Sequence, residues 1–367
     1  MARATISDVA AAAGVSQATV SRALRGSANV SPATRAKVEQ AAESLNFTLS
    51  KSASTLASGR TMRVLLLVSG PLNTWFNASV LQGVYNVLAP EGYDIIPSFV
   101  LNRSQLDRFF RDLPRDRNAD AIIITSFKFD TTLHDQLSTL GMPVVGLNSP
   151  STAGFDASIG IDNASAIASG VHLLRSLGHQ RIAFVHNYIP HDMVYGTSTR
   201  AAAFRAAAAD AGYAEHDAIM IEADQRDAAT ATPGTTEASA TTAAHIVARL
   251  LSCNRHPTGI MGETDEFTIP VYKELLRQHI AAPRDFSIMG FDDAPISRAL
   301  DLTTLHQDPA ALGSAAARKV LALLRGETIR HVHELVPATL VLRDTTGRAP
   351  DGAVTTEVLA SAGGGGR

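Results

Sequence analysis

Polar side chains of the kinds that read DNA bases are concentrated in a short stretch near the start of the chain. Glutamine, serine and arginine present hydrogen-bond donors and acceptors that match base edges in the major groove, and small neighbours leave such a surface uncrowded. A helix that reads bases enters the groove with its N-terminal residues first. If a helix begins near residue 17, the side chains that would meet base edges are Gln17, Ala18, Ser21 and Arg22.

Two short helices joined at a glycine would position this surface. Thr5 and Asp8 stand three residues apart, as in a capping box, and predict the start of the first helix. Gly14 can end that helix, Ser16 can cap the second, and Ser31-Pro32 starts a third. Taken alone, this pattern fits a helix-turn-helix and also a simple helical hairpin. The apolar positions that would join the three helices are Ile6, Val9, Ala10, Ala13, Val20, Leu24, Val38, Ala41, Ala42 and Leu45.

Charge distinguishes the first sixty residues from the rest of the chain. Residues 1–60 carry seven Lys or Arg against three Asp or Glu, a net charge of +4, whereas the whole chain carries −3 and the remainder therefore −7. Positive charge concentrated on a small module is typical of a surface that docks on DNA phosphates. It favours the helix-turn-helix over the hairpin.

Motifs in the same region carry a family resemblance. The segments TISDVA, AGVS, TVSRAL, VSPATRAKV and ASTLASGRT, in that order, resemble those of the lactose/galactose-repressor (LacI-type) family of bacterial transcription regulators. The resemblance continues to about residue 346 through GIDN, GHQRIAF, GFDD and LTTLHQ. It implies a helix-turn-helix DNA-binding head at 1–49, a hinge helix or linker at 50–61, and a two-lobed effector-binding and dimerisation domain at 62–346.

The resemblance also implies how the head holds DNA. In the family the hinge becomes helical on operator DNA, and each hinge of a dimer inserts a leucine into the minor groove; the matching residue here is Leu56, with Ala53 on the preceding turn. Because one recognition helix reads only a few base pairs, a homodimer on a pseudo-palindromic operator is expected. The residues expected to contact DNA phosphates are Thr5, Ser16, Thr19, Arg25 and Asn29.

Composition and missing motifs argue against several other classes of protein. With 45% hydrophobic and 18% charged residues among 367, the chain has an ordinary globular composition and room for two or three domains. Its single cysteine, Cys253, allows no intrachain disulfide, and neither a signal peptide nor a run of membrane length is present, which predicts a cytoplasmic protein without a membrane partner. No nucleotide, phosphate-loop or zinc-protease motif occurs, so we expect no cofactor, metal or catalytic residue.

Beyond residue 62, short apolar strands alternate with helices, and their number favours two lobes over one sheet. The expected fold is therefore α/β: an N-terminal all-α helix-turn-helix head plus a two-lobed, periplasmic-binding-protein-like core of doubly wound parallel sheets. The resemblance places lobe one at about 62–161 and 293–324, lobe two at about 162–292 and 325–346, and the composition predicts a disordered tail at 347–367. Strands are expected at Val64–Val68, Asp94–Val100, Ala121–Thr125, Pro143–Leu147, Ser158–Ile161, Arg181–His186, Ala218–Ile221, Gly259–Gly262 and Phe286–Gly290.

Ligands of such sheets bind beyond the carboxyl ends of the strands, so polar residues there are candidates for an effector site. Arg200 and Asp292 have the firmest family match, and together they could grip adjacent sugar hydroxyls, or instead only tie the lobes together. Trp75, the only tryptophan, would line the cleft or else pack in the core. The eight expected effector-binding residues are Asn73, Trp75, Phe76, Ser126, Asn148, Arg200, Asp265 and Asp292.

The sequence thus predicts a transcriptional regulator, a repressor, whose operator affinity is set by a small-molecule effector of sugar type. Two alternatives have the same core. A solute-binding protein would need a signal peptide and would lack the basic head. A sugar-processing enzyme could use Asp292 and Asp293 with Glu263 and Asp265 as paired carboxylates, but adjacent aspartates point in different directions.

Overall fold

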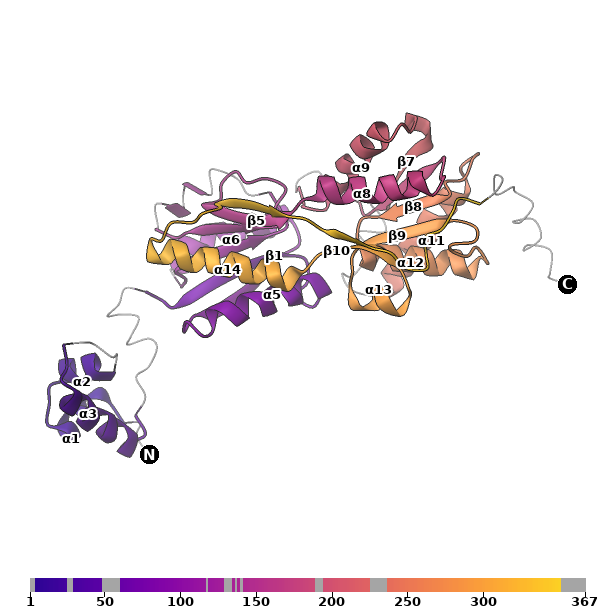
Figure 1. The fold of residues 1–367 in the computed structure, drawn as a ribbon. Coiled ribbons are helices and arrows are strands. Elements are labelled where there is room, and N and C mark those ends of the chain that lie inside the picture. Colours follow the sequence, from indigo (N-terminus) through magenta and orange to yellow (C-terminus); the bar gives the residue numbers. More distant parts are fainter. Residues whose placement is uncertain are drawn as a thin grey trace. The chain divides into compact units, whose positions relative to one another are not determined.

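The computed structural model describes residues 4–24, 29–47, 60–116, 118–128, 134–135, 137–138, 141–188, 194–224 and 236–350. The chain divides into two compact units, Met1–Met62 and Arg63–Arg367 (Figure 1). The predicted phosphate contact Arg25, the hinge residues Ala53 and Leu56, and the tail from residue 351 lie outside the described residues.

Three short helices form the first unit: α1 (Ile6–Ala13), α2 (Gln17–Leu24) and α3 (Pro32–Ser44). The predicted capping box is present, because the Thr5 N–H donates to Asp8 Oδ2 (2.7 Å) and the Asp8 N–H donates to Thr5 Oγ1 (3.4 Å). Gly14 adopts φ 65° and ψ 34°, a left-handed conformation that turns the chain into α2. The helices enclose a small apolar core of Val9, Ala10, Val20, Ala23, Val30, Val38, Ala41 and Ala42.

The first lobe of the second unit is built on a six-stranded, all-parallel sheet in the order β11-β5-β4-β3-β1-β2. The central strands β3, β4 and β5 are entirely buried, and the apolar runs of β3 and β4 predict this burial. The strands are β1 (Arg63–Ser69), β2 (Asp94–Val100), β3 (Ala121–Thr125), β4 (Val144–Leu147), β5 (Ala157–Ile161) and β11 (His333–Val336), and the helices are α5 (Trp75–Leu88), α6 (Arg103–Asp116) and α14 (Pro309–Arg325).

The second lobe has another six-stranded sheet, in the order β12-β10-β9-β8-β6-β7, in which only the edge strand β12 is antiparallel to its neighbour. The nine predicted strands are present, each within two residues of the expected ends. The strands are β6 (Ile182–His186), β7 (Ala218–Glu222), β8 (Gly259–Gly262), β9 (Ser287–Asp292), β10 (Thr303–His306) and β12 (Thr339–Val341), and the helices are α8 (Asn163–Ser176), α9 (Ser198–Asp210), α11 (Thr236–Leu251), α12 (Asp265–Arg277), α13 (Pro295–Ala299) and the 3₁₀ turn η1 (Glu215–Asp217).

Helix α14 lies against α5 in the first lobe, although the two are more than 200 residues apart in sequence (Figure 1). Two glycines allow the backbones to approach closely. A Cβ at Gly83 would lie 2.0 Å from the carbonyl oxygen of Ala310, and one at Gly313 would lie 2.3 Å from that of Val80. No side chain fits at either position without separating the helices.

The chain crosses between the lobes three times, and two of these crossings lie at positions that differ from the predicted ones. β10 pairs with β9, so the chain enters lobe one at Asp308, the N-cap of α14, and not near residue 293. β11 pairs with β5 in lobe one, which corrects the assignment of 325–346 as a whole to lobe two; the chain returns to lobe two at β12. These three strands have only three or four residues each, too few for their hydrophobic pattern to be recognised.

The start of the predicted tail is also ordered on lobe two. The Ala349 N–H donates to the carbonyl of Leu177 (2.8 Å), and the Gly347 N–H donates to Ser287 Oγ (3.0 Å). His179, completely buried, contacts the Gly347 carbonyl through Nε2 (3.2 Å). The segment 347–350 is therefore part of the core unit.

Candidate functional site

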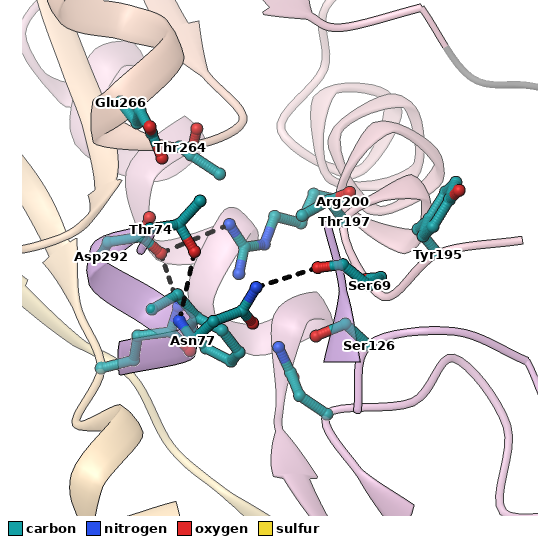
Figure 2. A pocket seen from close by; sticks show the side chains of 13 residues that line it. Ser69, Thr74, Asn77, Ser126, Tyr195, Thr197, Arg200, Thr264, Glu266 and Asp292 are labelled. Carbon is teal, nitrogen blue, oxygen red and sulfur yellow. Dashed lines mark hydrogen bonds and ion pairs between the residues drawn. The ribbon is translucent and has the colours of Figure 1, made fainter. Parts of the chain in front are cut away.

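A cavity of about 180 Å³ lies between the two lobes, where carboxyl ends of strands from both sheets meet (Figure 2). Lobe one contributes the ends of β1, β3 and β4 and the first turn of α5, and lobe two contributes the starts of α9 and α12 and the end of β9. The lining residues are Ser69, Thr74, Phe76, Asn77, Ser126, Asn148, Tyr195, Thr197, Arg200, Thr264, Glu266, Asp292 and Gln307.

Three of these residues have strained backbones at the ends of buried strands. Ser126 has φ 66°, Asn148 has φ 50° and Asp292 has φ 125°. Positive φ in a residue other than glycine costs of order 1–3 kcal/mol when it is strained, and it persists only where the surroundings impose it. Such residues concentrate at ligand sites, and here they lie around one cavity.

Arg200, on α9, is the central cation of the cleft and is only 1% exposed. Its Nε donates to Asn163 Oδ1 (3.0 Å), and its Nη1 donates to the Glu263 carbonyl (2.5 Å) and lies 3.7 Å from Asp292 Oδ1. The guanidinium carbon stacks 3.5 Å from the centroid of the Phe291 ring. Burial lowers the pKa of Arg200, and the nearby carboxylates oppose that shift. The side chain is therefore held rigidly, with its position set by lobe two alone.

Asp292 is the carboxyl group closest to Arg200, and burial raises its pKa to about 7 although Arg200 lowers it. Gln307 Nε2 donates to Asp292 Oδ1 (2.5 Å). Burial also raises the pKa of Glu263 and of Asp265. Because Arg200 and Asp292 both belong to lobe two, their pairing cannot tie the lobes together, which removes that alternative.

Five of the eight predicted effector-binding residues line the cavity: Phe76, Ser126, Asn148, Arg200 and Asp292. Asn73 is exposed and does not line it. Asp265 is fully buried behind the wall, where its carboxylate accepts hydrogen bonds from Ser297 Oγ (2.6 Å), Thr304 Oγ1 (2.7 Å) and the Ala294 N–H (2.9 Å). Its position shows a role in holding the β9–α13 connection.

The structure places Trp75 in a second cavity, of about 340 Å³, rather than in the cleft with Arg200. Thr74 caps α5, so Trp75 is the first helical residue. Successive helical residues are rotated by about 100°. Phe76 and Asn77 therefore face the cleft, while Trp75 turns toward Arg298 and His306.

Eight residues that line the cavity were not predicted from the sequence. Several lie in or just before the first turns of helices that follow strands, where the lengths of the connections decide which side chain faces inward. Asn77 could have been found, because an asparagine in the first turn after a strand can hold the intervening loop; its Nδ2 donates to the carbonyls of Ser69 and Pro71 (both 2.9 Å). The missed residues are Ser69, Thr74, Asn77, Tyr195, Thr197, Thr264, Glu266 and Gln307.

The predicted base-reading surface lies on the outer side of α2. Gln17, Ala18 and Arg22 are exposed and Ser21 is half-buried, while Val20 and Ala23 of the same helix enter the core. Among the predicted phosphate contacts, the Ser16 hydroxyl caps α2 by accepting from the Thr19 N–H (3.2 Å), and the Thr5 hydroxyl donates to Asp8 Oδ2 (2.7 Å). Asn29 is exposed. The contacts of these residues with DNA stay predictions.

Within the described parts of the chain, no group of three or more His, Cys, Asp or Glu side chains is arranged to hold a metal ion. A search of the same residues finds no helix with the length and apolar composition needed to cross a membrane.

A helix-turn-helix unit combined with a two-lobed α/β unit that encloses a polar cleft defines a class of protein, the DNA-binding regulators with a sensor core. Comparisons with known proteins agree. Residues 5–50 match the lacI family of bacterial regulatory proteins, and residues 171–346 match the periplasmic binding protein-like domain. Residues 5–50 therefore form a DNA-binding domain of the lacI family, and like its relatives the chain is a transcriptional regulator and not an enzyme.

Individual relatives are distant but cover nearly the whole chain. Catabolite control protein A of Priestia megaterium is 26% identical over 344 residues, which cover 93% of this chain and 99% of that protein. The structure of the Lac repressor dimer bound to operator and the anti-inducer ONPF has a TM-score of 0.78 at 23% identity, covers 94% of this chain and 100% of its own, and shows the shared fold. The complex of the regulator CelR with cellobiose has a TM-score of 0.63 at 25% identity, with coverage of 94% and 100%.

Proposed function

We propose that this regulator is a homodimeric repressor whose affinity for operator DNA is controlled by a polyhydroxylated small molecule, of sugar type, held between its lobes. The observation that carries the proposal is the chemistry of the cleft. Around Arg200 and Asp292, most lining residues are uncharged hydroxyl or amide side chains contributed by both lobes. Such groups match the alternating donors and acceptors of adjacent sugar hydroxyls.

Contacts from both lobes give the ligand a way to act at a distance. A ligand shifts an equilibrium only by its differential affinity for the two states. Ser69, Ser126 and Asn148 approach it from lobe one, and Arg200 and Asp292 from lobe two, so the ligand favours one arrangement of the lobes over others. In a dimer, that rearrangement would change the spacing of the two DNA heads.

The proposal for DNA follows the exposed face of α2. Gln17, Ala18, Ser21 and Arg22 read bases, and the half-site read by one head requires a two-fold partner for a specific operator. The Lac repressor with the same fold was solved as a dimer on its operator, and CelR was solved with a sugar. A regulator of bacterial DNA would act in the cytoplasm.

The hinge is expected to contact the minor groove of the operator. Leu56 is the candidate minor-groove wedge, and it lies outside the described residues. A wedged side chain unstacks a base step and bends DNA. Leu56→Ala is therefore expected to reduce operator bending in a circular-permutation gel assay, and unaltered bending would remove Leu56 from the mechanism.

The test of effector control uses a substitution that fills the cleft without removing a structural bond. Thr197 precedes α9, lines the cavity, and makes no capping hydrogen bond with its side chain. Thr197→Trp is expected to abolish the response to the effector while operator affinity without effector stays within about twofold. The matched control is Ala202→Trp, at an exposed position on the same helix and outside the cavity.

The experiment is a thermal-shift screen of sugars, followed by operator titration in fluorescence anisotropy with and without each hit, at fixed salt. A fall in operator affinity with ligand identifies an inducer, and a rise identifies a corepressor. If Thr197→Trp responds like the parent at the same ligand concentration, the cleft is not the effector site. If no sugar changes operator affinity in the parent, the proposed ligand class is wrong.

A further inference from the structure

The charges on the wall of the cleft are unequal. In the described part of the chain, Arg200 is the only lysine or arginine that lines the cavity, whereas Asp292 and Glu266 both line it with carboxyl groups. Glu266 is exposed, and its charge contributes to the raised pKa of Asp292. Figure 2 shows Glu266 and Asp292 on the same side of the cavity. Behind them, Glu263 and Asp265 add two more carboxyl groups.

The carboxyl groups around Arg200 weaken its attraction for an anionic ligand. Its Nε and Nη1 are bound to Asn163 and to the Glu263 carbonyl. Its charge interacts with three carboxyl groups, those of Asp292, Glu263 and Asp265. No described residue accepts a hydrogen bond from Nη2, so this nitrogen is the donor available to a ligand. One donor from a guanidinium already surrounded by carboxyls suits a hydroxyl better than a phosphate.

The start of α12 further disfavours an anionic ligand. Thr264 caps the helix by accepting from the Phe267 N–H (3.2 Å), and both Thr264 and Glu266 line the cavity. The N-terminus of a helix normally favours an anion through its free N–H groups and its dipole. Here the first turn carries its own carboxylates, Asp265 and Glu266. A ligand phosphate that approached this end would meet a negative side chain.

The geometry points to a cleft that selects uncharged or amine-bearing polyhydroxylated ligands and excludes their phosphorylated and carboxylated counterparts, with Glu266 as the specificity-determining residue. This inference rests on the proposed function, since it concerns the same cleft. It narrows the ligand from sugar derivatives in general to neutral sugars, glycosides and amino sugars. The lobe-two wall supplies the negative field, and the hydroxyl and amide groups of both lobes supply the hydrogen bonds.

The test compares matched ligands on the full-length protein. Calorimetry at fixed pH and salt would measure glucose against glucose 6-phosphate, gluconate and glucosamine, and ribose against ribose 5-phosphate, with cellobiose as a further neutral probe. For each sugar that binds, the phosphorylated or acidic partner is expected to bind at least tenfold more weakly. Glu266→Lys is expected to reduce that discrimination at least tenfold, and Glu266→Gln to reduce it in part.

The control variant is Glu215→Lys, which makes the same charge change at an exposed site of lobe two outside the cavity and is expected to leave the discrimination unchanged. Equal or tighter binding of the phosphorylated partner by the parent would overturn the charge selection and leave the proposed function standing. If Glu266→Lys and the parent discriminate equally between neutral and anionic ligands, Glu266 does not determine the specificity of the cleft. If no member of the panel binds, the proposed ligand class fails and this inference fails with it.

Discussion

Replacing Arg200 by alanine is expected to destabilise the core unit as well as change the cleft. The substitution leaves Asn163 Oδ1 and the Glu263 carbonyl without the donor they now share, and it leaves the buried Asp292 without its cation. Removing one partner of a buried ion pair costs about 3–5 kcal/mol. For a unit of roughly 150–250 residues, the size range of one lobe, about 2–4 °C of melting temperature per kcal/mol gives a fall of roughly 6–20 °C.

The dependence of this loss on pH provides a second readout. Arg200 lowers the pKa of Asp292 against the effect of burial, and the resulting value is about 7. Without Arg200 that pKa rises further, so Asp292 must stay protonated in the folded variant. Holding the proton costs more as the pH increases. The difference in melting temperature between parent and Arg200→Ala is therefore expected to be larger at pH 8 than at pH 6.

Differential scanning calorimetry at both pH values would measure these effects. The control is Arg205→Ala, which removes an exposed arginine from the same helix and should shift the melting temperature by less than about 2 °C. A shift for Arg200→Ala no larger than that of the control would refute the reasoning, because the buried guanidinium would then carry no structural role. A loss independent of pH would refute the account of Asp292 alone.

Three further substitutions test other parts of the molecule. Arg22→Ala is expected to weaken operator binding by about 1–3 kcal/mol in anisotropy titrations while salt-dependent binding to random DNA persists, and equal losses on both would exclude base reading. Burial lowers the pKa of His179 below 6.5, so its contribution to stability is present above pH 6.5 and is lost as the pH falls. His179→Gln should therefore flatten the decline of the unfolding free energy between pH 7 and 5, as measured in urea titrations. Parallel declines in the variant and the parent would contradict this expectation. Gly83→Ala places a methyl group against the Ala310 carbonyl and should lower the free energy of unfolding by about 1–3 kcal/mol or more. The control Gln82→Ala, at the neighbouring position, should have little effect. A Gly83→Ala protein as stable as the parent would show that α5 and α14 can separate freely.

The sequence was most informative where secondary structure and burial coincide. The strand at Ala121–Thr125 was predicted with both ends correct, because an unbroken apolar run bounded by polar residues has one interpretation in a parallel sheet. The first two helices of the DNA-binding head were equally predictable, since Thr5, Gly14 and Ser16 each mark one end of a helix. Local signals of this kind need no knowledge of the remaining fold.

Features that depend on distant contacts were less accessible. β10, with the sequence TTLH, is buried by its neighbours and not by its own hydrophobicity. Trp75 was expected in the cleft because it follows a strand, but its place as the first residue of α5, directly after the N-cap Thr74, decides which way it points. Glu266 was not among the predicted site residues, and only the structure shows that the first turn of α12 lines the cleft.

The position of α14 near the C-terminus has a consequence for synthesis of the protein. Residues 63–161 supply five strands of the first sheet, but α14, which packs on β3, β4 and β5, is completed only at Arg325. At roughly 5–20 residues per second, a ribosome needs about 7–30 s to translate the intervening second lobe. Throughout that interval the nascent chain carries an apolar sheet face without its helix, and transiently exposed apolar surface of this kind favours aggregation over folding.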